Sequence, residues 1–348
     1  MSIVNTCSHL LDVILGMTCA EKLKMVLNVL FHEWHMHPPW LTAFHDEMGK
    51  ISDDELDAVF RDIDPVSREQ IGKYVSCQRG FPLTEENSQY FFFNYHKFFT
   101  DNERKWRGRV LRSYLRELKN YECDEKVLGG VESILHHHGL GLCCSAVRDY
   151  IRDGIFVDAG GCFGDSAMVF LRHYHPEKVI TFEPAGSNRK IFCSTMRLNR
   201  IPESQYEVIP MGLGKKETSF DYVETSGGGN FLANRGAEGE NVHVSVTTLD
   251  NFCRERDLAN IKVIKADIEG MGLDMLLGAE EVIRKNRPVL LLSIYHNRDE
   301  LLGIYDTLKK WDIAYHLEAR LLGFPAYPGE LTLIGYPEEL DKGAPPQR

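Results

Sequence analysis

The stretch Ile155-Phe-Val-Asp158-Ala-Gly160-Gly-Cys-Phe-Gly164-Asp165 combines a short apolar run, an acidic residue and a glycine turn. The apolar run predicts a buried strand, and the residues after Asp165 have the spacing of a helix. Glycines let backbone approach a bound molecule closely, and the first turn of a helix offers free N–H groups. The stretch therefore predicts a ligand site at the carboxyl edge of a parallel sheet.

A second apolar run, residues 179–182, ends in Glu183-Pro184, nineteen residues after Gly164. A carboxylate at this distance and at the tip of the next strand is placed to bind the two hydroxyls of a ribose. The alternative is a solvated acid at a strand end. The turn lacks the spacing G-x-G-x-x-G, so a dinucleotide with a pyrophosphate fits poorly. The two segments together predict a site for a nucleoside-containing cofactor.

The composition is that of a folded protein: 348 residues, 43% hydrophobic and 26% charged. The formal charge of −11 predicts repulsion from nucleic acid and anionic membranes, and it favours a small or neutral substrate. Nine cysteines without C-x-x-C spacing, no secretory signal and no apolar run long enough for a membrane span predict a cytoplasmic protein with reduced thiols. The oligomeric state stays open.

Residues 1–125 have the apolar spacing of helices and predict an all-helical N-terminal subdomain, a possible cap over an acceptor site. Within it, Asp53 is the expected N-cap of one helix, and residues 104–118 are expected to form another with Trp106 facing inward. Linking helices are expected over 126–150, the first of them over 126–138. Residues 338–348 are expected to be a disordered tail.

From residue 151 to 337 the pattern changes to strands that alternate with helices. The expected strands are 155–159, 179–182, 206–211, 261–266, 289–294, 313–318 and 330–335, with a small antiparallel excursion between 218 and 247. This order predicts an α/β doubly wound sheet closed by a C-terminal antiparallel hairpin.

Between about residues 150 and 337 the chain resembles the FkbM-type S-adenosylmethionine-dependent methyltransferases. The resemblance rests on Val157–Asp165, on Phe182-Glu-Pro184 with Asn199 closing the next helix, on Val246–Phe252, on Lys265–Gly270 continuing to Leu276–Ala279, and on Pro288–His296. It does not cover the first 125 residues. The family usually has a small residue and a glutamate after Glu-Gly, where this chain has Met271-Gly272.

The resemblance implies a class I methyltransferase, Rossmann-like fold with S-adenosyl-L-methionine as the cofactor. It also implies an enzyme that most often methylates a hydroxyl oxygen, with polyketide and sugar hydroxyls among the family's acceptors. The expected partner of this chain is accordingly a small-molecule or glycan acceptor that carries a hydroxyl.

Nine residues are expected to bind the cofactor: eight of them follow the first three strands, and the ninth is Asp267, after the fourth strand. Gly160 and Gly164 would cradle the methionine part of the cofactor, and Asp158 would order the turn through backbone N–H groups or hold the ammonium through water. Asp165 sits at a helix start, where the helix dipole favours an anion in any case. The remaining ones are Glu183 with Pro184 for the ribose, and Met211 with Gly212, expected at the end of the third strand, for the adenine.

The catalytic candidates follow the fourth and fifth strands. Lys265, Asp267 and Glu269 alternate and are expected on one side of the sheet, where the lysine would keep both carboxylates ionised. Asp267 would contact the cofactor or the reacting hydroxyl, and Glu269 would act on substrate or cap the next helix. His296 is the expected base, with Asp267 as the second choice, because an imidazole titrates near neutral pH. Tyr295 is expected to point to the opposite face.

Four further motifs have weaker functional interpretations. His32, His35 and His37, like His136-His137-His138 with Cys143-Cys144, are expected to be structural, and no metal site is predicted. The aromatic run 90–99 is core or the lining of an acceptor pocket. Residues 226–230 are a lid or a plain loop.

Two other function classes remain open. Gly272, in place of the family's glutamate, motivates a protein that binds S-adenosylmethionine or S-adenosylhomocysteine without turnover. A nicotinamide-dependent oxidoreductase on a Rossmann sheet is disfavoured by the missing third glycine.

Overall fold

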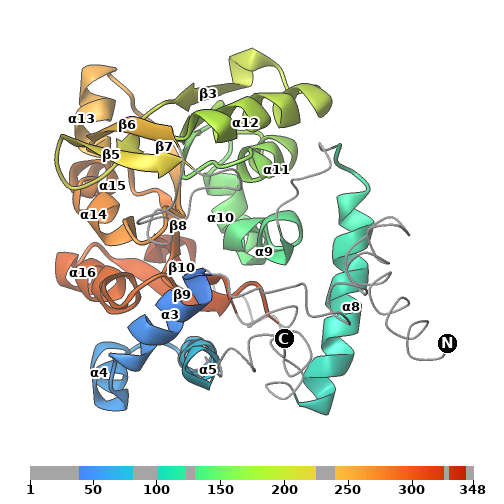
Figure 1. Ribbon diagram of the computed structural model, residues 1–348, viewed down its shortest axis with the longest axis vertical. Coiled ribbons are helices and arrows are strands. Elements are labelled where there is room, and N and C mark those ends of the chain that lie inside the picture. Colours follow the sequence, from blue (N-terminus) through green and yellow to red (C-terminus); the bar gives the residue numbers. More distant parts are fainter. Residues whose placement is uncertain (1–38, 81–99, 123–129, 225–239, 325–328, 342–348) are drawn as a thin grey trace.

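The computed structural model describes residues 39–80, 100–122, 130–224, 240–324 and 329–341, and Figure 1 shows their arrangement. A seven-stranded sheet has the order β3-β2-β1-β7-β8-β10-β9. The strands are β1 (Ile155–Ala159), β2 (Lys178–Phe182), β3 (Tyr206–Ile209), β7 (Ile261–Ala266), β8 (Val289–Ser293), β9 (Tyr315–Leu321) and β10 (Leu331–Pro337). The pairs from β3 to β8 are parallel, whereas β10 is antiparallel to both β8 and β9. The predicted doubly wound sheet with a terminal hairpin is confirmed.

The central strands are apolar on both faces because helices cover both faces. All residues of β1 and β8 are buried. Successive side chains of a strand point to opposite faces, so Val157 and Ala159 join one core cluster while Phe156 joins the other. Three layers therefore form, with the sheet in the middle.

The first cluster contains α3 (Pro39–Gly49), α4 (Asp53–Val59), α5 (Pro65–Gly80), α13 (Leu249–Glu255), α14 (Gly272–Leu277), α15 (Glu280–Asn286), the π-helical turn η4 (Asp299–Gly303) and α16 (Ile304–Trp311). The second contains α9 (Val131–Ile134), the 3-10 turn η2 (His137–Leu142), α10 (Ser145–Tyr150), α11 (Asp165–His173) and α12 (Gly186–Leu198). Helix α8 (Asp101–Leu118) packs on α9. Two further 3-10 turns are η3 (Glu203–Gln205) and η5 (Glu338–Leu340).

A second sheet has the order β4-β6-β5 and lies between β3 and α13 in the sequence. Its strands are β4 (Gly212–Leu213), β5 (Thr218–Glu224) and β6 (Glu240–Thr247). β5 and β6 are antiparallel, so the predicted excursion is confirmed.

Helix α5 packs against β9, the last strand of the main sheet. The Ala319 N–H donates to the Ser67 hydroxyl at 2.8 Å, and the Leu321 N–H donates to the Gln70 side-chain oxygen at 2.6 Å. In Figure 1 this helix lies beside α3 and α4 below the hairpin. The N-terminal helices are thus attached to the sheet through backbone hydrogen bonds as well as apolar contacts.

Three local predictions for the helical regions are wrong. The N-cap of α4 is Ser52, which forms a capping box with Glu55, because a hydroxyl one residue earlier can reach the Glu55 N–H. Trp106 is 40% exposed and packs edge-on against Phe324 instead of facing inward. The helix expected up to residue 138 ends at Ile134 in the described part, because residues 137–139 have positive φ.

Two predicted boundaries in the sheet domain also change. Met211 and Gly212 do not end the third strand, because β3 stops at Ile209 before Pro210, which has no N–H to donate, and Gly212 starts β4. The tail expected from residue 338 begins with the ordered turn η5.

Candidate active site at the carboxyl edge of the sheet

The turn between β1 and α11 lies against the end of β7. Gly160 has φ 79° and Gly164 has φ 89°, values that favour glycine. A Cβ on Gly160 would lie 1.9 Å from the Asp267 carbonyl oxygen, so no side chain fits there. The Asp267 N–H in turn donates to the Ala159 carbonyl at 3.0 Å. The two predicted halves of the site are therefore in direct contact.

A buried ion pair holds the base of this turn. Asp158 and Lys265 are 0% and 4% exposed, and their charged atoms are 3.1 Å apart. The Ser166 hydroxyl donates to Asp158 at 2.6 Å, and the Lys265 ammonium donates to the Gly160 carbonyl at 2.7 Å. Burial disfavours the ammonium, but Asp158, Asp267 and Asp165 outweigh it and raise the pKa of Lys265. Asp158 thus orders the turn through side chains, and Lys265 belongs to the same framework.

Glu183 follows β2 and is 5% exposed. One carboxylate oxygen accepts the Cys162 N–H at 2.9 Å, and the other accepts the Ala185 N–H at 2.8 Å. Burial raises its pKa against these bonds. The neighbouring Pro184 carbonyl accepts a hydrogen bond from Arg189. Each carboxylate oxygen has a second lone pair, so Glu183 can accept further hydrogen bonds from a ligand.

Asp165 is the first residue of α11, as expected, in the acidic first turn of that helix. Beside it, Glu132 of α9 is nearly buried and accepts the Gly130 N–H at 2.8 Å. Burial raises the pKa of Glu132 to about 7, and Asp165 and Asp267 add to the rise. Residues before β1 therefore contribute charge to the site, which the sequence did not indicate.

Asp267 lies at the centre of the second half of the site. Its carboxylate accepts the Tyr295 hydroxyl at 3.2 Å and lies 3.3 Å from His296 Nε2. Burial disfavours its charge, but His296 and Lys265 outweigh burial and lower its pKa, as predicted for this carboxylate. Tyr295 does not point to the opposite face: β8 ends at Ser293, so strand alternation does not extend to residues 295 and 296.

His296 is 2% exposed and faces carboxylates at both ring nitrogens. Its Nδ1 is 2.8 Å from Glu300 Oε2, and its Nε2 is near Asp267 and 3.8 Å from Glu269. Burial opposes the charge, but Glu300, Asp267 and Glu269 raise the pKa of His296 to about 10. A protonated imidazole cannot accept a proton, so the geometry disfavours His296 as the base.

Glu269 is the most accessible of these acids, with a side chain 37% exposed. Burial, with Asp267, Glu300 and Glu183, raises its pKa to about 7 against the effect of His296. Lys265 and Glu269 do not continue one alternating row, because β7 ends at Ala266 and Glu269 has φ 54°. The capping alternative for Glu269 is wrong, since Glu300 accepts the Gly272 N–H at the start of α14 at 2.8 Å.

Glu300 and Tyr295 are the main site residues that sequence reasoning missed. Glu300 follows His296 by four residues, a spacing that brings two side chains together on a helical turn. This four-residue spacing is the feature of the sequence from which the contact between His296 and Glu300 could have been predicted.

In the described chain, the contacts of the His136–His138 segment are those of structural histidines. His137 Nδ1 lies 2.6 Å from the Tyr174 hydroxyl, and its ring stacks on His173 at 4.5 Å. Burial lowers the pKa of His136 to about 4 and that of His137 to about 3. Within the described ranges, no group of three or more His, Cys, Asp or Glu side chains is arranged to hold a metal ion. His32, His35, His37, the aromatic run 90–99 and residues 226–230 lie outside the described residues.

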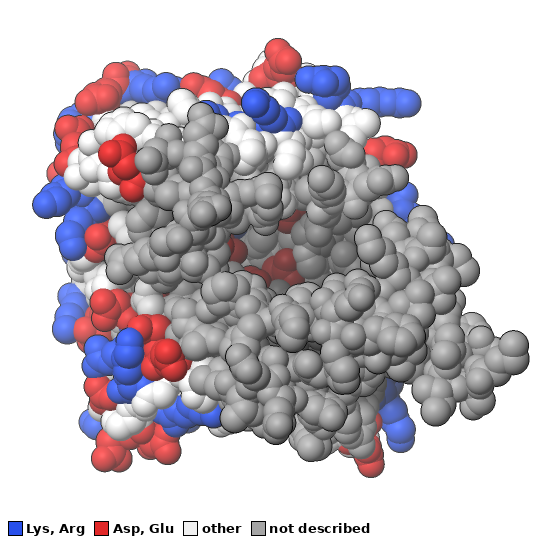
Figure 2. Space-filling model, viewed as in Figure 1, with Lys and Arg blue, Asp and Glu red and all other residues white. Residues whose placement is uncertain are grey.

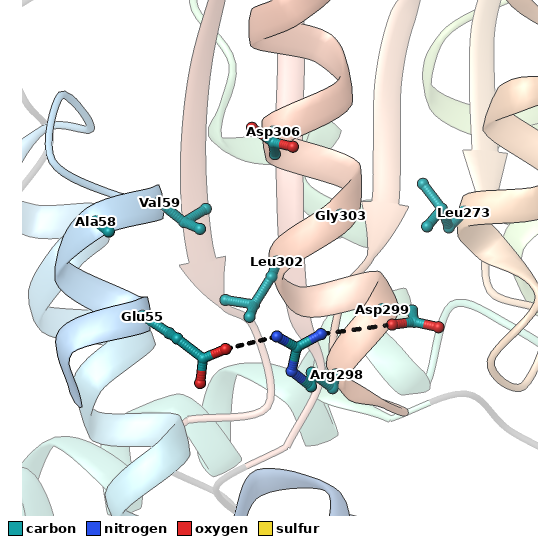
Figure 3. A pocket seen from close by; sticks show the side chains of 9 residues that line it. All are labelled: Glu55, Ala58, Val59, Leu273, Arg298, Asp299, Leu302, Gly303 and Asp306. Carbon is teal, nitrogen blue, oxygen red and sulfur yellow. Dashed lines mark hydrogen bonds and ion pairs between the residues drawn. The ribbon is translucent and has the colours of Figure 1, made fainter. Parts of the chain in front are cut away.

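A separate cavity of about 300 Å³ lies between α4 and the η4–α16 segment (Figure 3). Arg298 is among the lining residues. Its Nη2 is 2.6 Å from Glu55 Oε1, and its Nη1 is 3.9 Å from Asp299 Oδ1. None of the predicted cofactor or catalytic residues lines it.

The described surface carries charges of both signs. On the face in Figure 2, basic and acidic side chains are interspersed, and some acidic side chains are visible deep in the middle of the view. None of the helices in the described ranges has both the length and the apolar character needed to cross a bilayer.

Comparison with known proteins gives a family for the sheet domain. Residues 158–317 match the family model described as the Methyltransferase FkbM domain. A curated relative, Methyltransferase 1 of Beauveria bassiana (strain ARSEF 2860), is 26% identical over 159 residues, which cover 40% of this chain and 63% of that protein. The match thus spans less than two thirds of the relative's length.

Two solved structures are similar to this one. Methyltransferase FkbM from Methylobacillus flagellatus KT has 21% identity and a TM-score of 0.45, covering 72% of this chain and 59% of that chain. The O-methyltransferase from Bacillus cereus in complex with SAH has 10% identity and a TM-score of 0.39, covering 70% of this chain and 94% of that chain. The sequence match is the finding that identifies a family: residues 158–317 of this chain match the methyltransferase FkbM domain.

Proposed function

We propose that this chain transfers a methyl group from S-adenosyl-L-methionine to a hydroxyl oxygen of a small molecule or glycan. The observation that carries the proposal is the contact between the glycine turn and the acidic cluster within an FkbM domain. Gly160 abuts the Asp267 carbonyl, and the Asp267 carboxylate reaches His296. A cofactor bound over the turn would therefore lie beside groups that can handle a proton. A cytoplasmic location remains a prediction from the spacing of the cysteines.

The residues of the turn fit a nucleoside cofactor. Gly160 and Gly164 adopt backbone conformations that let main chain contact a ligand, and Glu183 holds the turn while keeping lone pairs available. We assign the turn to the methionine part, Glu183 to the ribose and Asp267 to the cofactor or the reacting hydroxyl. When bound, the cofactor supplies an electrophilic methyl group. The chain supplies alignment, which in well-oriented model reactions is worth about 7–11 kcal/mol.

An alcohol must lose its proton as its oxygen is methylated, and Glu269 is the best acceptor of that proton. Its pKa of about 7 and its partial exposure suit a base at neutral pH. Asp267 is a weaker base because its pKa is lowered. His296 is held as a cation and instead stabilises both carboxylates.

Two observations weigh against the two other function classes. The binding-only alternative rested on a missing carboxylate at Gly272, and Glu300 places a carboxylate there. The oxidoreductase alternative rested on a Rossmann sheet alone, whereas the family match is to a methyltransferase domain.

Calorimetric titration with S-adenosylhomocysteine tests the cofactor assignment. We expect wild type to bind and Glu183→Gln to bind about tenfold or more weakly, because an amide places a donor where an acceptor is needed. Glu203→Gln, at an exposed position in η3, is the matched control and should bind as wild type does. No binding by folded wild type would overturn the proposed function.

Methyl transfer from labelled S-adenosylmethionine to a panel of hydroxylated acceptors tests the chemistry. Glu269→Gln should keep cofactor affinity and lower turnover by about 10²–10⁴-fold. Glu281→Gln, an exposed acid on α15, should leave turnover unchanged. Full turnover in Glu269→Gln would exclude Glu269 as the base.

A further inference from the structure

Glu300 is buried between two parts of the site. Its side chain is 1% exposed. One carboxylate oxygen accepts the Gly272 N–H at 2.8 Å, and the other lies 2.8 Å from His296 Nδ1. Its own N–H donates to the Asn297 side chain at 2.8 Å. The carboxylate is thus held by two partners, and the backbone of Glu300 is held by a third.

The position of Gly272 explains why the carboxylate can lie there. A Cβ on residue 272 would be 2.8 Å from Glu300 Oε1 and 3.3 Å from Glu300 Cδ. A side chain at 272 and the Glu300 carboxylate therefore compete for one space. The chain lacks the glutamate expected near this position in sequence and has a carboxylate from η4 in its place.

Each ring nitrogen of His296 has a carboxylate as its neighbour. An ionised carboxylate only accepts hydrogen bonds, so an ionised Glu300 calls for a hydrogen on Nδ1, and the Asp267 carboxylate, 3.3 Å from Nε2, favours a charged ring. The other groups around the ring are aromatic: Phe44 of α3 lies edge-on at 5.9 Å, and Tyr295 lies at 4.0 Å. The titratable groups that face the ring are Glu300 from η4, Asp267 and Glu269 from the segment after β7, and Tyr295 at the end of β8.

We propose that Glu300 is the positioning residue of this site, which holds His296 doubly protonated with its Nε2–H directed at Asp267 and Glu269. Its role in turnover rests on the proposed function, but its effect on His296 does not. Through the imidazolium, Glu300 keeps Asp267 ionised. A residue that touches neither cofactor nor acceptor then sets the charge state of the groups beside the base.

Nitrogen-detected NMR of histidine-labelled protein measures this directly. In wild type we expect both ring nitrogens of His296 to remain protonated up to about pH 9, consistent with its raised pKa. In Glu300→Gln the ring should titrate at clearly lower pH, because one anion is lost. Glutamine keeps an acceptor for the Gly272 N–H, so the fold should be retained. The His296→Gln spectrum assigns the signal.

A matched control and a second variant separate charge from packing. Asp299→Asn removes a neighbouring but exposed charge of η4 and should leave the His296 titration unchanged. Gly272→Ala keeps every charge but displaces the carboxylate, and it should lower the titration midpoint as Glu300→Gln does. A midpoint that is unchanged in both Glu300→Gln and Gly272→Ala would overturn the proposal.

The kinetic readout is the pH profile of kcat. Glu300→Gln should lower kcat about tenfold above the pH at which His296 loses its proton in the variant, with little loss below that pH and little change in the affinity for S-adenosylhomocysteine. Equal loss of kcat at all pH values would indicate a merely structural role and would contradict the proposal. If wild type binds no S-adenosylhomocysteine while the NMR midpoint still shifts, only the proposed function fails.

Discussion

The two halves of the sheet's carboxyl edge satisfy their buried carboxylates in different ways. Around β1 and β2, Asp158 and Glu183 accept hydrogen bonds from backbone N–H groups, a serine and a lysine. Around β7 and β8, three carboxylates share one imidazole. Backbone N–H groups do not titrate, and Lys265 stays charged, so the first half is a fixed framework. The second half can change its protonation near neutral pH, as the proposed methyl transfer to an alcohol would require.

The largest expected effect comes from breaking the framework half. Asp158→Ala leaves the Lys265 ammonium buried without its nearest anion, and we expect a loss of about 3–5 kcal/mol in the free energy of unfolding. Urea denaturation followed by circular dichroism measures it.

The double variant Asp158→Ala/Lys265→Met is the control for this pair. It removes both charges, so it should be more stable than Asp158→Ala alone. If the two variants were equally unstable, the loss would come from the cavity and the missing Ser166 bond, and the ion pair would not be the framework's main element.

The next largest effect concerns the half around β7 and β8, because its titrating groups should make the free energy of unfolding depend on pH. His296 has a pKa near 6.5 when unfolded and about 10 when folded, so its stabilisation is complete below pH 6.5 and is lost as the pH rises through 10. The raised pKa values of Glu269 and Glu132 also make the protein less stable as the pH rises, but between pH 4.5 and 7. Between pH 7.5 and 9.5 wild type should therefore lose about 2–3 kcal/mol of stability through His296.

His296→Gln is the comparison for this pH range. It should show a flatter dependence of the free energy of unfolding on pH from 7.5 to 9.5. An equally steep dependence would assign the titration to other groups.

The smallest effect concerns the support that the N-terminal helices give to the titrating half. Tyr74 of α5 donates to the Tyr295 carbonyl at 2.5 Å, and both residues are buried. Tyr74→Phe should cost about 1 kcal/mol and leave S-adenosylhomocysteine affinity unchanged, because it touches only the β8 end. Tyr150→Phe, which removes hydrogen bonds to the carbonyls of Asn286, the last residue of α15, and of Arg287, is a control of similar chemistry. A large loss of affinity in Tyr74→Phe would mean that the two halves are not independent.

Sequence reasoning predicted the framework half well because its determinants are local. An apolar run, a glycine turn and an acid at the next strand end specify β1, the turn and Glu183 without long-range information. The strand β7 was predicted with its observed bounds, and Asn199 closes α12 as expected.

The half around β7 and β8 depends on contacts that the periodicity of the sequence does not indicate. The chain leaves β7 at Ala266 and turns through Glu269 with positive φ, so the alternation of the strand does not extend from Lys265 to Glu269. Tyr295 was misplaced for the same reason at the end of β8. Glu300 is held in the site by its contact with Gly272, 28 residues away in the sequence. That contact depends on how the helices pack.

The hydrogen bonds from Ser67 and Gln70 to β9 have a consequence for the behaviour of the whole molecule. β9 is an outer strand, and its outward N–H groups at Ala319 and Leu321 could otherwise pair with a strand of another chain. Helix α5 occupies them with side chains that cannot extend a sheet. A version shortened to start at residue 130 should therefore self-associate through this strand, so the N-terminal helices help to keep the methyltransferase domain from aggregating.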